Sequence, residues 1–524
     1  MKIYKTADIK MTPEVFHSAD HKKVVANFLG ISPKDIFDLK IFKKSVDARH
    51  KNNVCYVVSF TFCSEKSFSN PKITQAPERK DVFEKLTPRL SDKKIMVVGS
   101  GAAGLFCGLY LAKCGFCPTV IEQGKNVADR QKDVDKFWKS GILDLSSNIQ
   151  FGLGGAGTFS DGKLTTSANN ELVFSVLNQF VRYGAPDDIL TNGMPHIGTD
   201  NLKIAVQNIA DEIVSCGGKV LFETKLVDFD VSSNKIESVT LKNKGKVFIE
   251  KADVLVLAIG HSARDTFELL YHKGVEMRQK PFSVGVRVEH LQETINKGCY
   301  GQKYDKRLPA ATYKMAAHFG DRSAYTFCMC PGGFVVNASS EKGGVVTNGM
   351  SYFARDGVNA NSALLVNVDT SDFESDSPLA GIDFQRKIER SAFVQGGSNY
   401  SAPAQNVTDF LKGKPSVCFY ETRPTIMPKA LPCDLTKCLP EFVTKTLKKA
   451  LPEFGKRIEG FDKSGVLTGV ETRSSCPLKV VRNECFQSNI EGIFPIGEGS
   501  GYAGGIVTAA VDGLRCAMKI TETL

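Results

Sequence analysis

The chain has 524 residues, of which 42% are hydrophobic and 24% charged, a balance typical of soluble globular proteins with roughly two to four domains. It contains no apolar run of the roughly 18 residues that a membrane-spanning helix needs, and its first residues lack the apolar core of a secretory signal. We therefore expect no membrane contact and a cytoplasmic location, with an organelle as the open alternative. The 15 cysteines follow no regular framework, which favours reduced thiols, and the net charge is +10.

The first 92 residues have the pattern of a small unit and a linker. Residues 24–29 have helical character, and residues 36–42 and 54–62 are rich in β-branched and aromatic residues typical of strands. This pattern predicts a small N-terminal α+β domain over residues 1–70. Three prolines indicate a linker over residues 71–92.

A basic run at residues 43–51 raises the question of a nucleic-acid partner. One acidic residue interrupts the run and no aromatic residues alternate with it, which is more typical of a solvated surface. We therefore expect nucleic acid not to be a partner, and we keep an RNA-binding role of this unit as an alternative hypothesis.

A βαβ motif follows and organises the rest of the chain. The apolar residues 95–98 lead into Gly99-x-Gly101-x-x-Gly104, then into a helical stretch, and then into a second apolar run that ends on Glu122. Gly99 allows the tight turn, Gly101 allows the backbone to approach a pyrophosphate, and Gly104 allows the helix to lie close to the sheet. The helix N-terminus attracts a diphosphate, and a carboxylate at Glu122 can accept hydrogen bonds from a ribose. The motif predicts a dinucleotide site.

A second glycine-rich loop spans residues 148–164. So many glycines disfavour a helix or strand, so this backbone is expected to approach a bound group closely. Phe151, Phe159 and Leu164 argue against a solvated linker.

Later segments return to the same type of domain. A helix is predicted at 202–214, a strand at 219–222, a β-meander at 226–249, and a buried strand that ends on Gly260. Residues 277–480 differ in pattern, with strands at 282–289, 324–330 and 363–368 and helices at 384–394 and 441–451. A last strand runs into Gly497-Glu498-Gly499, and a helix begins near Gly505.

Five stretches carry a resemblance to a known family. They are Asn148-Ile-Gln-Phe with the glycines after it, Thr326-Phe-Cys-Met-Cys-Pro-Gly-Gly-Phe, Val346-Thr-Asn-Gly-Met-Ser-Tyr, Gly469-Val-Glu-Thr-Arg-Ser-Ser and Ile496-Gly-Glu-Gly-Ser-Gly-Tyr. The chain resembles an uncharacterised family of FAD-dependent dehydrogenases within the glutathione-reductase-like flavoprotein group. Two departures lie near the expected cofactor, Glu498 in place of the usual Asp and Leu153 in place of an acid.

The resemblance implies an α/β fold with a Rossmann-type, three-layer ββα FAD-binding domain, an inserted α+β substrate domain and the small N-terminal α+β domain. The FAD-binding domain would occupy residues 93–276 and 481–524, and the inserted substrate domain residues 277–480. FAD is the implied cofactor, and the last helix would point its positive end at the flavin. The predicted cofactor-binding residues are Gly99, Gly101, Ala102, Ala103, Gly104, Glu122, Gln123, Arg130, Gly154, Gly155, Thr158, Val227, Ala258, Gly260, Gly497, Glu498, Gly505 and Ile506.

The predicted activity is hydride transfer between flavin and a small-molecule substrate. Arg287, Tyr313 and Arg473 are the catalytic candidates, because arginines in the inserted domain could anchor a carboxylate or phosphate. An ordinary ion pair is the alternative for each arginine. A flavin-dependent monooxygenase and an FAD-containing binding or regulatory protein remain alternative functions.

Neither a second dinucleotide motif nor a metal-ligand set is evident, so NAD(P)H would bind only transiently and no metal is expected. Cys114 and Cys117 have CxxC spacing but fall in a helix-to-strand turn, away from the phosphate end. Cys328 and Cys330 are the stronger thiol candidates, with packing on one face of a strand as the alternative. Substrate, electron acceptor and oligomeric state are left open.

Overall fold

The computed structural model describes all residues except 52, 90 and 167–169. A five-stranded parallel sheet has the order β24-β12-β6-β7-β8. Its strands are β6 (Ile95–Val98), β7 (Thr119–Ile121), β8 (Lys219–Leu221), β12 (Val254–Leu257) and β24 (Ile493–Pro495). Within the described parts of the chain, every helix is too short or too polar to cross a bilayer.

Side chains alternate across this sheet and create its two neighbouring layers. Ile95 and Val97 of β6 face a cluster formed with the helices, whereas Met96 and Val98 face a cluster formed with a meander of three antiparallel strands. The meander consists of β9 (Thr224–Ser232), β10 (Lys235–Asn243) and β11 (Lys246–Lys251), and the helices are α3 (Ala102–Lys113), α5 (Leu172–Arg182), α6 (Gly198–Ser215) and α12 (Ile506–Thr523). A fully buried strand with period-two alternation produces the three-layer ββα arrangement predicted from the sequence.

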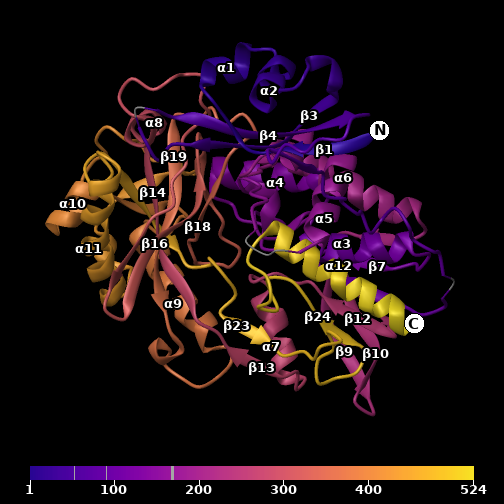
Figure 1. The fold of residues 1–524 in the computed structure, drawn as a ribbon. Coiled ribbons are helices and arrows are strands. Elements are labelled where there is room, and N and C mark those ends of the chain that lie inside the picture. Colours follow the sequence, from indigo (N-terminus) through magenta and orange to yellow (C-terminus); the bar gives the residue numbers. More distant parts are fainter. Residues whose placement is uncertain (52, 90, 167–169) are drawn as a thin grey trace.

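Close packing of α3 and α12 depends on glycine. A Cβ at Gly513 of α12 would collide with the backbone of Ala103 in α3. The C-terminal helix, yellow in Figure 1, therefore lies directly against the first helix of the βαβ motif, drawn in purple.

A second sheet has seven strands in the order β15-β16-β19-β14-β22-β20-β21. The strands are β14 (Phe282–Leu291), β15 (Ala316–Phe319), β16 (Arg322–Cys330), β19 (Asn359–Val368), β20 (Ala402–Asn406), β21 (Ala430–Pro432) and β22 (Val466–Glu471). Around it lie α8 (Gln292–Tyr300), α9 (Ala380–Gln395), α10 (Val407–Lys412), α11 (Glu441–Arg457) and the hairpin β17 (Phe334–Asn337) and β18 (Thr347–Met350). The amphipathic α11 packs on β16 and β19, and Val443, Leu447 and Leu451 are buried there, as their spacing predicts.

The chain passes between the two sheets at one place. β13 (Met277–Gln279) and β23 (Leu478–Val480) pair antiparallel, with Met277 opposite Val480. The segments that lead into and out of the second sheet therefore run side by side. Val134 of α4 (Val127–Ser140) packs with residues of the β17–β18 hairpin, and α7 (Arg264–His272) packs on the meander strand β9.

The N-terminal elements form a third sheet, drawn in indigo at the top of Figure 1. Its strands are β1 (Lys2–Thr6), β2 (Ile9–Met11), β3 (Phe37–Asp47), β4 (Cys55–Ser64) and β5 (Ile73–Gln75), with α1 (Pro13–Ser18) and α2 (His21–Leu29). The sequence pattern missed β1 and β2, which are short and have lysines among their apolar residues. It also treated residues 71–92 as a linker, but β5 pairs with β1 and Phe83 is buried against α3, so this segment is part of the packed structure.

Candidate functional site

A cavity of about 750 Å³ lies between the parallel sheet and the seven-stranded sheet. Both glycine-rich loops, the loop before α12 and the strand β16 contribute to its wall. Fourteen of the predicted cofactor residues line it, namely Gly99, Gly101, Ala102, Ala103, Glu122, Gln123, Gly154, Gly155, Ala258, Gly260, Gly497, Glu498, Gly505 and Ile506. The structure thus brings together segments that lie up to about 400 residues apart in the chain.

Bare backbone forms much of this wall. Gly99 adopts φ +100°, which an L side chain rarely does, and turns the chain from β6 toward α3. At Gly101, Gly260 and Gly505 a Cβ would meet no atom within 4 Å, so these positions open into the cavity. Because Gly101 provides no side-chain cap, the first N–H groups of α3 remain available to an anionic ligand. This arrangement fits the diphosphate of a dinucleotide.

Glu122 connects the two glycine-rich loops. One carboxylate oxygen accepts hydrogen bonds from the Ser100 N–H at 3.1 Å and the Ser100 hydroxyl at 2.7 Å. The other accepts from the N–H groups of Gly124 and Gly152, both at 2.9 Å. Four donors therefore occupy both oxygens of Glu122, and its predicted ribose contact stays a prediction.

Arg130 supports the second loop from behind and does not line the cavity, which differs from its predicted role. The side chain is fully buried, and its guanidinium donates to the carbonyl oxygens of Asn148, Ile149, Leu153 and Gly155 at 2.8–2.9 Å. Burial lowers the pKa of Arg130 to about 9. An arginine with all its partners in one loop fixes the loop's backbone rather than contacting a ligand.

Three other predicted cofactor residues also lie outside the cavity wall. Gly104 faces the backbone of Gly99, which is the packing role expected for it. Thr158 is buried, and its hydroxyl donates to the Leu153 carbonyl at 3.1 Å. Val227 lies on β9, where the preceding residues Thr224, Lys225 and Leu226 line the cavity instead.

The loop before α12 presents Glu498 to the cavity. The Gly497 N–H donates to Asp512 at 2.7 Å, and Arg482 pairs with the same carboxylate, so this turn is held in place. Burial raises the pKa of Glu498 to about 7. His261 lies 4.0 Å from it, and burial lowers the pKa of His261 to about 3. Around neutral pH the cavity therefore contains a neutral imidazole beside a carboxyl group that can hold a proton.

The opposite end of the cavity is formed by Tyr313, Phe327, Cys328, Lys163 and Arg355. The hydroxyl of Tyr313 lies 3.0 Å from that of Ser362, and burial raises the pKa of Tyr313 above its usual range. Burial opposes ionisation of Asp161, but Lys163 and Arg355 hold the pKa of this carboxyl well below its usual range. This end of the cavity therefore has cationic side chains beside aromatic ones.

Arg287, a catalytic candidate, does not line the cavity. Its side chain is fully buried and pairs with both oxygens of Glu471, at 2.5 and 2.9 Å. It also donates to the carbonyl of Cys328 at 2.9 Å and to Asn361 at 3.0 Å. Arg287 therefore links β14, β16, β19 and β22 and acts on the cavity only through those neighbours.

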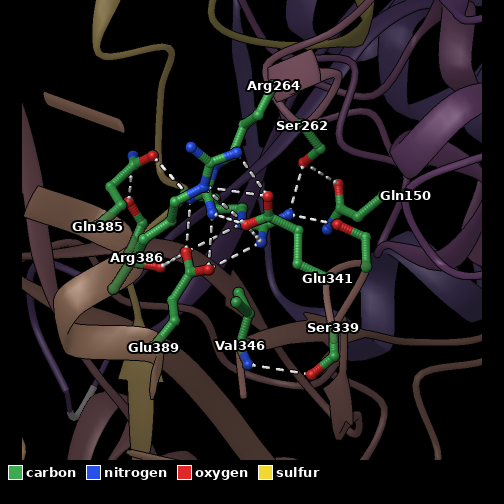
Figure 2. Close-up of polar contacts among 12 residues, drawn as sticks. Gln150, Ser262, Arg264, Ser339, Glu341, Val346, Gln385, Arg386 and Glu389 are labelled. Carbon is green, nitrogen blue, oxygen red and sulfur yellow. Dashed lines mark hydrogen bonds and ion pairs between the residues drawn. The ribbon is translucent and has the colours of Figure 1, made fainter. Parts of the chain in front are cut away.

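Arg473 does line the cavity, but its charge is already paired. It donates to both oxygens of Glu389, at 3.0 and 2.8 Å, and to the hydroxyls of Ser262 and Ser340. Arg264 pairs with the same Glu389 at 2.8 and 2.9 Å and also contacts Glu341, as Figure 2 shows. This cluster links α7, α9 and the segment after β22. The Arg473 guanidinium is therefore already occupied by Glu389 and is not free to bind a substrate anion in a bidentate manner.

Sequence reasoning missed Lys163, Asp161, Asp512 and the Glu389 cluster. Asp161 and Lys163 lie inside the second glycine-rich loop, so the motif itself marked their position. Glu389 and Asp512 had no comparable signal, because each is an acid on an ordinary amphipathic helix.

Two family models match the chain. Residues 281–474 match the model described as FAD-dependent protein, C-terminal domain-like, and residues 3–63 match a domain of unknown function, DUF8436. Residues 281–474 are therefore similar to the C-terminal domain of FAD-dependent proteins. The larger match covers the seven-stranded sheet and the helices around it.

A full-length relative identifies the family. The chain is 44% identical over 519 residues to an uncharacterised protein of Clostridium beijerinckii (strain ATCC 51743 / NCIMB 8052). The matched region covers 96% of this chain and 95% of the clostridial protein. The chain belongs to the same family as that protein.

Solved structures show a more distant likeness. The halogenase PltM, in a structure with FAD, has a TM-score of 0.42 at 11% identity and covers 83% of this chain and 70% of the halogenase. The flavin-dependent brominase Bmp2 has a TM-score of 0.39 at 13% identity, covering 82% and 79% of the two chains. A geranylgeranyl bacteriochlorophyll reductase-like protein of Thermoplasma acidophilum has a TM-score of 0.35 at 11% identity, covering 82% and 78%. Similarity at this level gives no argument about activity or substrate.

Proposed function

We propose that the chain is an FAD-dependent oxidoreductase of the glutathione-reductase-like flavoprotein group, with a dehydrogenase or reductase activity on a small molecule. The observation that carries this proposal is the single cavity that runs from the N-terminus of α3, past both glycine-rich loops, to the face of β16. Its open glycine positions fit a dinucleotide, and its far end is lined by aromatic and cationic side chains.

FAD bound here would supply two-electron chemistry at its flavin ring. In this proposal the first turn of α3 and the backbone at Gly155 bind the diphosphate, and Glu122 and Arg130 keep the two loops in position. The N-terminus of α12 places a positive dipole end at the flavin, where reduction adds negative charge. The Glu498 carboxyl holds a proton up to about pH 7 on the same side.

The region of residues 277–480 would hold the substrate. Tyr313, Phe327 and Lys163 line the cavity at this end, and the Lys163 ammonium lies 3.4 Å from the Asp161 carboxylate. An aromatic wall next to a lysine suits a substrate with an apolar body and one anionic or electron-rich group. A flavin-dependent monooxygenase would use the same pocket, and NAD(P)H would serve either reaction as a transient reductant.

The remaining alternative is an FAD-containing protein that binds RNA through its N-terminal unit. Two basic residues of the run at 43–51 are already paired, because Lys44 contacts Asp188 and Arg49 lies 2.7 Å from Asp47. Their charge is partly neutralised within the protein, which leaves less of it for phosphates. This observation favours the enzyme.

The test is an anaerobic one. The purified protein is examined by visible absorption, and NADPH and NADH are then added separately while the flavin band is followed. Rapid bleaching supports a reductase or hydroxylase fed by a pyridine nucleotide, and admission of oxygen then separates the two. A band that persists points to a dehydrogenase reduced by its own substrate or to a structural flavin. A colourless protein that cannot be reconstituted with FAD refutes the proposal.

A further inference from the structure

Two cysteines occupy an irregular point of β16 at the cavity. Cys328 lines the cavity, and Cys330 is fully buried. Phe327 pairs with Ala363 and Cys330 pairs with Asn361, so three steps along β16 match two steps along β19 and one extra residue bulges out. Cys328 has φ 43°, a left-handed conformation that is unfavourable for a residue with a Cβ. Bulges of this kind redirect side chains near functional sites.

The bulge brings the two thiols to one place. The Cys330 thiol donates to the carbonyl of Cys328 at 3.4 Å, so it points back along the strand instead of outward. Arg287 donates to the same carbonyl at 2.9 Å and lies 4.0 Å from the Cys330 sulfur. Simple packing of two side chains on one face of a regular strand, the alternative from the sequence, does not describe this geometry.

The electrostatic surroundings distinguish the two thiols. Hydrogen bonding with Cys330, helped by the charges of Lys163 and Arg287, holds the pKa of Cys328 well below its usual range, although burial opposes this. The same contact and burial raise the pKa of Cys330. The Lys163 ammonium forms an ion pair with the Asp161 carboxylate at 3.4 Å and has no hydrogen-bond partner among the described residues. A thiolate next to a thiol is the reactive form of a dithiol.

Other cysteines lack this combination. All 15 belong to the described residues, and of them Cys328 alone lines the cavity. Cys114 is buried and Cys117 is exposed, both outside the cavity wall.

We propose that Cys328 and Cys330 form a redox-active dithiol that exchanges two electrons with FAD bound in the cavity, an inference that rests on the proposed function. In the forward direction the Cys328 thiolate and the Cys330 thiol form one S–S bond, the S–H bond of Cys330 breaks, and two electrons and that proton pass to the oxidised flavin. The reverse reaction consumes a reduced flavin and restores thiol and thiolate. A disulfide between residues two apart closes a small ring, and strained disulfides are the labile or catalytic ones.

The first experiment needs no flavin. The full-length chain, stripped of FAD, is equilibrated anaerobically with mixtures of reduced and oxidised glutathione, quenched in acid, alkylated and mapped by peptide mass spectrometry. We expect the peptide with both cysteines to lose two hydrogens and to resist alkylation as the mixture becomes more oxidising. Two alkylated thiols in fully oxidised glutathione would overturn the proposal, as would a disulfide to any other cysteine.

The second experiment uses the FAD-loaded protein and counts electrons. In an anaerobic dithionite titration, the oxidised wild type should take up about four electrons per flavin, two for the flavin and two for the disulfide. Cys328→Ser and Cys330→Ser should each take up about two. Cys485→Ser, at an exposed cysteine, is the matched control and should behave as wild type. A wild-type uptake of about two electrons refutes the dithiol while FAD chemistry stands. Failure to bind FAD instead refutes the proposed function and leaves the first experiment intact.

Discussion

Replacing Glu389 by glutamine should destabilise the protein strongly, because this carboxylate neutralises two buried arginines. Glu389 is 1% exposed and accepts four hydrogen bonds from Arg264 and Arg473 at 2.8–3.0 Å, and one from the Thr472 hydroxyl at 2.7 Å. The substitution E389Q keeps the shape of the side chain and removes the charge. Two guanidinium groups would then share much less negative charge in a buried place.

The size of the stability loss in E389Q depends on the contacts that Arg264 and Arg473 keep. Breaking a buried ion pair by removing one partner costs about 3–5 kcal/mol. Arg264 keeps its contact with Glu341, and Arg473 keeps the hydroxyls of Ser262 and Ser340, so the lower end applies. For the unit of roughly 200 residues around the seven-stranded sheet, a loss of about 3 kcal/mol in the free energy of unfolding corresponds to a melting temperature lower by about 6–12 °C.

Calorimetry and urea unfolding test this estimate. The matched control is E374Q, since Glu374 pairs with Lys387 of the same helix α9 but both side chains are highly exposed. Such a surface pair contributes about 0–1 kcal/mol. A loss below about 1 kcal/mol for E389Q, equal to that of E374Q, would refute the reasoning.

The pH dependence gives a second check. Burial would raise the pKa of Glu389, but Arg264 and Arg473 hold it well below the usual range. A carboxyl group with a depressed folded-state pKa stabilises the fold above its unfolded-state pKa of about 4.3 and loses that contribution as the pH falls toward the folded value. Wild type should therefore lose more stability than E389Q below about pH 4.

Three further predictions concern single positions. Gly101→Leu should raise the dissociation constant for FAD by about hundredfold, because the new side chain projects into the open cavity. Titration calorimetry measures this constant, and Gly101→Ala, with its smaller side chain, is the control. The melting temperature of the FAD-free protein should be unchanged in both variants. Arg130→Met should leave four buried carbonyls without their donor, at about 1–3 kcal/mol, and speed hydrogen exchange in residues 148–155; unchanged exchange there would contradict the assigned role. Burial raises the pKa of Glu289 to about 7, so its ionisation costs stability as the pH rises from about 4.3 to about 7, and E289Q should flatten the stability profile in that window. An E289Q profile parallel to wild type over that window would remove this explanation.

The cofactor half of the site could be predicted because its signals are local. The turn at Gly99, the helix start at Gly101 and the close packing at Gly104 each depend on a few consecutive residues, and the structure places them as the motif requires. The continuous apolar run of residues 95–98 is likewise typical of a strand buried on both faces, as β6 is. Local rules also misplaced Arg130, since a sequence pattern cannot tell a ligand contact from four carbonyl contacts.

The surroundings of the two candidate catalytic arginines depend on residues that are distant in the chain. Arg473 meets Glu389 across 84 positions, and Arg287 meets Glu471 across 184. No residue close in sequence to either arginine indicates its carboxylate partner, so the sequence predicted each arginine as a substrate contact. The bulge at Cys328 is similar, because it exists only through the register of β16 against β19.

The order of the parallel strands explains why the cavity lies where it does. From β6 the chain builds outward through β7 and β8, and then returns to the other side of β6 with β12 and β24. The connections after β6 and β12 therefore leave in opposite directions, and a crevice opens at their carboxyl ends, where Gly99 contacts the Ala258 backbone. Residues Thr326, Phe327 and Cys328 of β16, in the seven-stranded sheet, line the same cavity, so under the proposed function a substrate would meet FAD beside β16. Substitutions at Tyr313 or Phe327 should consequently alter substrate affinity while FAD affinity stays unchanged.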